Sequence, residues 1–178
     1  LEIEYALVRE SIRSAVAKAR ESWGVVPSVG LPPLGTVIGM GAALASPINP
    51  GLSALLLLDA LQPVGVTALR LDPYGLMAAL GNIAYVEPLV VVQVLETGGL
   101  THLGTAICPA GRTGSGTAIE AAITFGNGRK MALSVPNGEI RAVALPVGQK
   151  ATLAIKLGRG LTLNGKNRAT LTVEGGTA

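Results

Sequence analysis

The sequence predicts an α/β segment followed by an all-β segment. Over the first half of the chain, apolar strand-like runs alternate with helix-like stretches, which is typical of an α/β layer. From about residue 99 the apolar residues recur at every second position instead, as they do in half-buried strands. We therefore expect residues 1–97 to form the α/β part and residues 98–178 to form an antiparallel β-sheet or small barrel.

The first element predicted is a helix over residues 1–23, because apolar residues recur there at steps of three and four. They share one face of that helix: Leu1, Tyr5, Val8, Ile12, Ala15, Ala19 and Trp23. Acidic residues dominate its first turns and basic residues its later turns, in agreement with the helix dipole. Gly24 follows as a stop signal, and a connector rich in proline and glycine comes next.

A strand and a second helix come next. Thr36–Ile38 is a short apolar run that predicts a buried strand, and Gly39-Met40-Gly41 follows it. Asn49 and Pro50 have the residue types of a helix cap and a first helical turn. We expect this helix to cover residues 51–62 and to be buried, because it is apolar on most faces.

Another strand and a short helix complete the α/β part. Residues 66–72 are predicted to form the strand, residues 72–75 a turn, and residues 76–84 the helix. Residues 88–95 are compatible with a strand or a helix, since Pro88 and the valine run do not decide between them.

Alternating strands dominate the second half. The apolar positions that share a sheet face are Ile119, Ala121, Ile123 and Phe125, then Ala151, Leu153, Ile155 and Leu157, then Ala169, Leu171 and Val173. Asn-Gly pairs begin at residues 127, 137 and 164. Because Asn-Gly between alternating strands is the strongest short-range hairpin signal, we expect tight turns at these positions.

Composition narrows the functional classes. The chain is 49% hydrophobic, but no apolar run approaches the ~18 residues of a membrane helix, so we expect no membrane association. The net charge of +3 comes without a basic run and with few aromatic residues, which argues against nucleic-acid binding. One cysteine and one histidine argue against a disulfide framework and a zinc site, and favour a cytoplasmic location. Because the chain begins without Met, we expect it to be a piece of a longer protein.

Few residues are candidates for function. Gly39-Met40-Gly41 either lets the backbone approach a nucleotide or forms only a tight turn. Leu44 stands where a dinucleotide-binding fingerprint has its third glycine, so the Rossmann interpretation is weak. Asp59 lies in an apolar helix and either pairs with Arg70 or points to water. Asp72 either takes part in catalysis or simply opens a turn.

His102 and Cys108 lie on one predicted strand, and their even spacing places both on one face. Six strand residues span roughly 20 Å, so the two side chains do not touch unless the chain bends. Cys108 is therefore interpreted as a small core residue. Residues 110–117 are rich in glycine but lack the lysine and helix of a phosphate loop, and they predict a flexible hairpin loop. The residues alone assemble no catalytic set and no metal site.

Three stretches of the chain resemble one protein family. They begin with VIGMGAAL at residue 37, PLVVVQVLETGGLTHLGTAICP at residue 88 and VALPVGQK at residue 143, and the most specific part is LLLLDALQPVGVTALRLD. Their order resembles the C-terminal part of glutamate mutase L (MutL) proteins. The resemblance implies the end of an actin-like (ribonuclease H-like) ATPase lobe over residues 1–97, followed by the β domain.

The resemblance also implies a function. Gly39, Met40 and Gly41 match the glycine turn that passes the adenosine of ATP or ADP in that superfamily. The phosphate- and Mg²⁺-binding parts lie outside these 178 residues, so we expect no cofactor and no catalysis for this chain alone. The implied role is chaperone-like, with an adenosylcobalamin-dependent mutase or the missing N-terminal lobe as protein partner, and a homo-oligomer is also compatible.

Two alternatives remain open at this point. One is a structural or self-assembling module that binds no nucleotide. The other is a small enzyme that uses Asp59, Asp72 or Cys108.

Overall fold

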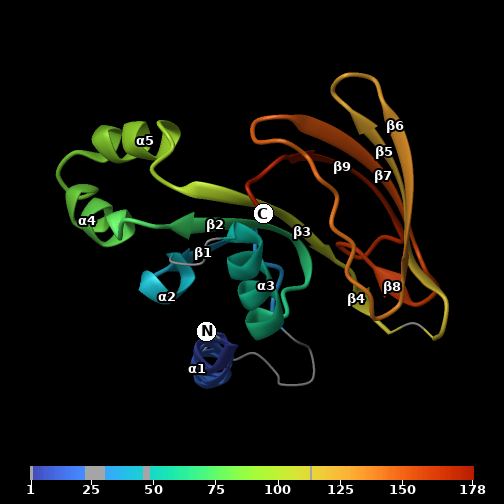
Figure 1. Ribbon diagram of the computed structural model, residues 1–178, viewed down its shortest axis with the longest axis horizontal. Coiled ribbons are helices and arrows are strands. Elements are labelled where there is room, and N and C mark those ends of the chain that lie inside the picture. Colours follow the sequence, from blue (N-terminus) through green and yellow to red (C-terminus); the bar gives the residue numbers. More distant parts are fainter. Residues whose placement is uncertain (1, 23–30, 46–48, 113) are drawn as a thin grey trace.

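The computed structural model describes residues 2–22, 31–45, 49–112 and 114–178. Its architecture is mixed α/β, with a helix-covered sheet and a separate antiparallel sheet, and the described residues form no closed barrel. Figure 1 shows the long strands β2 and β3 running between the two parts. The predicted order of an α/β part followed by a β part is therefore confirmed.

The first sheet has three strands in the order β1-β2-β3. β1 (Thr36–Met40) pairs in parallel with β2 (Gly65–Asp72), and β2 pairs antiparallel with β3 (Thr101–Cys108). β1 is two residues longer than predicted, so Gly39 and Met40 belong to the strand and the turn begins only at Gly41. The predicted strand end was wrong because the pairing with β2 continues to the last residues of both strands.

α3 (Pro50–Leu61) covers one face of this sheet, and the N-terminal helix packs on α3. α1 (Glu2–Ser22) agrees with the first predicted helix, and its Val8 and Ile12 pack against the core formed by α3 and the sheet. Leu1, Trp23, Gly24 and the connector over residues 25–30 lie outside the described residues. A short helix that the sequence did not predict, α2 (Ala42–Ala45), follows the Gly41 turn.

α3 (Pro50–Leu61) begins as expected, because the Asn49 side chain accepts a hydrogen bond from the backbone N–H of Gly51 at 2.8 Å. Four of its residues are buried: Ser53, Ala54, Leu57 and Ala60. The expectation of a helix buried on most faces was wrong, since Leu52 and Leu55 are 38% and 49% exposed.

Residues 76–96 form a pair of helices beyond the end of β2. α4 (Leu76–Ile83) matches the predicted helix, and α5 (Pro88–Glu96) shows that residues 88–95 are helical rather than extended. No residue of α5 is buried. The turn that follows α5 contains Gly98, so the predicted domain boundary falls between α5 and β3.

The second sheet has four antiparallel strands in the order β6-β5-β7-β9. Their bounds are β5 (Thr117–Phe125), β6 (Lys130–Pro136), β7 (Lys150–Leu157) and β9 (Arg168–Glu174). A small two-stranded sheet of β4 (Ala110–Gly111) and β8 (Leu161–Thr162) lies beside it. The alternating residues predicted for β5, β7 and β9 all face the core of this part of the chain.

All three Asn-Gly pairs lie in turns, but only the pair at Asn127 joins two strands that pair with each other. Asn127 turns β5 into β6, and Asn164 has a left-handed φ of 51° in a turn that Leu163 and Lys166 close with two hydrogen bonds. Asn137 follows β6 in a tight turn, in which the N–H of Glu139 donates to the carbonyl of Pro136 at 3.2 Å, but neither this turn nor the one at Asn164 joins two strands of one sheet. Residues 139–149 continue from the Asn137 turn as a long connection, because β7 pairs with β5 rather than with β6.

The sheet of β1, β2 and β3 contributes to two hydrophobic cores. Leu69, Leu71 and Leu103 face α3, whereas Val66 and Ile107 pack against the core of the four-stranded sheet. β2 and β3 therefore connect the two parts by packing as well as by sequence.

Candidate functional site

The carboxyl ends of β1 and β2 hold the glycines that the sequence singled out. Because these strands are parallel, Met40 at the end of β1 lies opposite Asp72 at the end of β2. In open α/β sheets, ligands bind at the carboxyl ends of such strands. The fold therefore places Gly39, Met40, Gly41 and Asp72 at one edge of the sheet.

Gly39 is packed beneath leucine side chains. A Cβ atom on this residue would lie 3.0 Å from Leu71 Cδ2 and 3.2 Å from the Cδ1 atoms of Leu44 and Leu57. Gly39 itself is buried in the strand. Its missing side chain lets α2, α3 and β2 close over β1, so Gly39 has a packing role.

Gly41 has the opposite surroundings. Its φ of +96° is left-handed, it is exposed, and no heavy atom lies within 4 Å of the position that a Cβ would take. Its carbonyl accepts hydrogen bonds from the N–H groups of Leu44 at 3.1 Å and Ala45 at 3.0 Å, which starts α2. The neighbouring Met40 is 50% exposed. Of the two glycines, only Gly41 offers open backbone to a ligand.

Asp72 is 1% exposed and serves the start of α4. Its Oδ1 accepts a hydrogen bond from the N–H of Leu76 and its Oδ2 one from the N–H of Met77, both at 2.8 Å. Burial raises the pKa of the Asp72 carboxyl, but the hydrogen bonds from the backbone N–H groups of Met77, Leu76, Tyr74 and Gly75 outweigh it and hold the pKa below its usual value. The carboxylate thus occupies the helix N-terminus, where an anionic ligand would otherwise bind.

Asp59 lies on the exposed side of α3 and has a different partner from the one considered. Its Oδ2 is 3.2 Å from Nη1 of Arg9, which joins α3 to α1, and the Asp59 side chain is 51% exposed. Arg70 is therefore not its partner. An exposed pair of this kind contributes about 0–1 kcal/mol to stability.

The prediction that His102 and Cys108 share one face of their strand was wrong. Both lie on β3, but an irregularity in the pairing leaves Leu103 without a partner on β2. The irregularity reverses the alternation: His102 lies opposite Arg70, whereas Cys108 lies opposite Gly65. Cys108 is partly buried and belongs to neither hydrophobic core, and its burial raises the pKa of the thiol.

The candidate catalytic residues do not come together. Asp72 is at one end of β2, and Cys108 pairs with the residue at the other end. The seven-residue separation along β2 corresponds to about 23 Å. His102 contacts a third region, since its Nε2 lies 3.3 Å from the backbone carbonyl oxygen of Glu174.

The described residues offer no metal site and no membrane helix, and the predicted loop over residues 110–117 is partly strand. The described residues contain no cluster of His, Cys, Asp and Glu that would hold a metal ion. Within the same residues, no helix has the length and apolarity needed to cross a bilayer. Of the predicted loop over residues 110–117, the first two residues form β4 and the last begins β5, and Thr113 lies outside the described part.

Sequence reasoning missed an exposed apolar segment that runs from the turn after α4 into the first two residues of α5. Residues 85–89 are all exposed, and Tyr85 reaches 94%. The segment was not recognised because helix-like sequence lies on each side of it, and the apolar residues of a helix are ordinarily assigned to the core. The sequence signal available was the absence of any Lys or Arg from residue 71 to residue 111.

No protein-family model, curated protein or solved structure matches the chain.

Proposed function

We propose that this chain is the C-terminal part of a glutamate mutase L-type protein with an actin-like (ribonuclease H-like) ATPase lobe. Residues 1–97 supply one wall of an adenine-nucleotide cleft, and residues 98–178 form an interaction domain. The observation that supports this proposal is the Gly41 turn, a left-handed glycine with open space beside it at the carboxyl end of a parallel strand.

Within this proposal the three residues of the turn have separate roles. Gly41 and Met40 contact the purine side of the nucleotide. Gly39 has no side chain, and this lets the neighbouring leucines pack closely against the strand. Asp72 is already committed to the start of α4 and does not serve as a metal ligand. Phosphoryl transfer depends on positioning and charge neutralisation, so this wall alone does not hydrolyse ATP.

The other parts of the proposal concern the parent protein. ATP or ADP enters through the missing lobe, and the parent acts as a chaperone-like, weakly ATP-hydrolysing protein in the cytoplasm. Its partner is an adenosylcobalamin-dependent mutase. The β domain contributes protein contact surface rather than chemistry.

The test measures a weak contact, because half of a cleft binds its ligand with a Kd in the range of about 1 mM. Amide NMR spectra are recorded during titration with AMP, for the wild type, Gly41→Asp and Gly138→Asp. Gly138 is the matched control, since it is also a left-handed, exposed glycine with open space beside it. We expect shifts at residues 40–45 that Gly41→Asp removes and Gly138→Asp keeps. ATP turnover by the wild type above that of Gly41→Asp would contradict the proposed division of roles.

A structural or interaction module without nucleotide binding is the second candidate. It is favoured by Gly39, whose surroundings are fully explained by packing, and by the exposed apolar segment at residues 85–89. It predicts that AMP, ADP and ATP leave the amide spectrum unchanged, which is the outcome that would exclude the first candidate.

A further inference from the structure

The chain divides into halves of opposite charge. Residues 99–178 contain nine Lys and Arg residues and three Asp and Glu residues, which gives a formal charge of +6. Residues 1–98 contain five basic and eight acidic residues, which gives −3. The modest net charge of +3 therefore hides a strong asymmetry.

The basic half has a shallow hollow on the outer face of its four-stranded sheet. Ala122 on β5 lies in register with Ala132 on β6 and with Ala154 on β7, so methyl groups form its floor. The hollow measures about 530 Å³. Its floor is apolar and open to solvent, and we refer to it as the alanine hollow.

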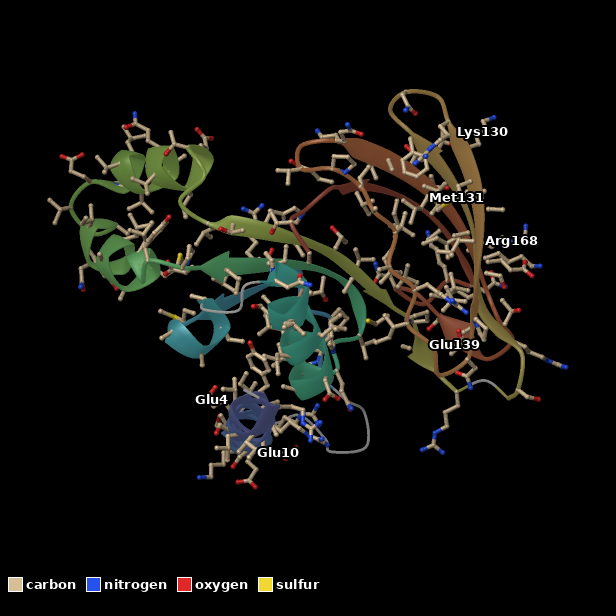
Figure 2. The ribbon with its side chains drawn as sticks, in the orientation of Figure 1. Glu4, Glu10, Lys130, Met131, Glu139 and Arg168 are labelled. Atoms are coloured by element: carbon tan, nitrogen blue, oxygen red, sulfur yellow. The ribbon has the colours of Figure 1, made fainter. Side chains whose placement is uncertain are left out.

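Charged residues border the alanine hollow on one side: Glu120 and Lys156 line it, and Arg168 lies one strand beyond them on β9. Glu120, Lys156 and Arg168 stand in register on β5, β7 and β9, and Lys156 Nζ lies 2.9 Å from Glu120 Oε2. Arg159 borders a smaller adjoining hollow that shares Glu120 and Lys156. Among the described residues, Arg159 and Arg168 form no ion pair, and Figure 2 shows Arg168 on the outer side of the sheet. This border is therefore available to an acidic group.

The acidic half presents a matching projection. Residues 85–89, which we call the knob, comprise the turn before α5 and the first two residues of α5, and three of their large apolar side chains are exposed: Tyr85 at 94%, Val86 at 78% and Leu89 at 72%. Glu87 lies between them and is also exposed. With no Lys or Arg between residues 71 and 111, the knob is both apolar and acidic.

The knob and the alanine hollow lie at opposite ends of the molecule. Figure 1 shows α4 and α5 at one end of the long axis and the four-stranded sheet at the other. One chain cannot fill its own hollow in this arrangement. Two different surfaces of one molecule that complement each other make a heterologous, head-to-tail contact between copies.

We propose that the knob of one copy docks into the alanine hollow of a second copy. Tyr85, Val86 and Leu89 cover the methyl floor, and Glu87 faces Arg168 at the border. A contact of this size is small and forms weak, concentration-dependent assemblies. The proposal does not depend on nucleotide binding and stands independently of the proposed function.

The experiment measures the molar mass by sedimentation equilibrium up to a protein concentration of about 1 mM. We compare the wild type with Glu87→Lys, Arg168→Glu and the control Lys166→Glu, which makes the same charge reversal as Arg168→Glu at the exposed turn between β8 and β9. The wild type and Lys166→Glu are expected to associate. Glu87→Lys and Arg168→Glu are each expected to associate at least about tenfold more weakly, because each places like charges together.

Mixing the two charge-reversed variants is the decisive step. A Lys at position 87 on one copy then faces a Glu at position 168 on the other, so the mixture should regain association. A wild type that stays monomeric, or a mixture that associates no better than its components, overturns the proposal. Binding of poly-glutamate or single-stranded DNA to a chain that stays monomeric would likewise overturn it, and would assign the hollow to another acidic partner. Circular dichroism verifies that each variant folds.

Discussion

Replacing Asp72 with Asn tests how much of the fold depends on one buried carboxylate. Asp72 is 1% exposed and accepts two 2.8 Å hydrogen bonds from the N–H groups of Leu76 and Met77. A hydrogen bond to a charged group contributes about 1.5–3 kcal/mol. Asn keeps one acceptor oxygen, but an NH₂ group replaces the second oxygen. That NH₂ group then faces a backbone N–H, so two donors meet. We therefore expect Asp72→Asn to lower the free energy of unfolding by about 2–3 kcal/mol.

The assay is urea unfolding at pH 7, with Asp59→Asn as the control. Asp59 makes only an exposed ion pair, so its substitution should cost about 0–1 kcal/mol. In thermal unfolding the Asp72→Asn effect corresponds to a decrease in Tm of about 5–10 °C for a chain of this size. Equal stability of Asp72→Asn and the wild type at pH 7 would refute the assigned role.

The pH dependence gives a second check on the same residue. Because the pKa of Asp72 is lower in the folded chain than in the unfolded chain, its stabilisation is present above the unfolded pKa and is lost as the pH falls through the folded value. The stability difference between wild type and Asp72→Asn should thus shrink below about pH 4. A difference that stays constant in acid would show that the charge on Asp72 is not what stabilises α4.

Three further predictions concern packing. Gly39→Ala should destabilise the chain by about 1–3 kcal/mol, because the new Cβ lies 3.0–3.2 Å from three leucine side chains. Gly35→Ala, with open space around it, should leave the stability unchanged. Chemical denaturation measures both variants. Leu103→Ala should cost about 2–5 kcal/mol in the same assay, since Leu103 is 1% exposed, and a loss below 1 kcal/mol would contradict its central place in the core. Cys108 should react slowly with a thiol reagent at neutral pH and quickly in urea, because burial raises its pKa; equal rates would refute this.

Local patterns predicted most of the elements. The Asn49 cap, the alternation in β5, β7 and β9, and the Asn164 turn depend on neighbouring residues, and the structure contains all three. Each is specified by residues within a few positions of one another. Elements of this kind are the ones that a single sequence predicts well.

Features that depend on pairing between distant strands were not predictable in the same way. Asn137 and Asn164 have the same Asn-Gly signal as Asn127, but neither joins two paired strands, because β7 pairs with β5 and β8 pairs with β4 instead. The end of β1 depends on how far β2 continues beside it. Sequence alternation indicates that a strand exists, but not which strand lies next to it.

The candidate site shows the same division between local and distant effects. The left-handed turn at Gly41 follows from a local glycine pattern. The burial of Gly39, in contrast, depends on Leu57 and Leu71 from two other elements. From the sequence, Gly39 and Gly41 were expected to act together. In the fold, Gly39 is needed for packing, whereas the backbone at Gly41 is open.

Because Gly39 is packed and Gly41 is open, the proposed nucleotide contact involves fewer residues than the sequence suggested. A ligand at the end of β1 can contact the backbone at Gly41 and the exposed part of Met40, but it cannot reach Gly39 without moving the leucines above it. Substitution of Gly39 should therefore alter stability and leave AMP-induced shifts at residues 40–45 in place, provided that the variant folds. Substitution of Gly41 by Asp should remove those shifts, because Asp tolerates the left-handed conformation better than other side chains and fills the open space. Shifts that disappear in Gly39→Ala but persist in Gly41→Asp would reverse the assignment of the two residues.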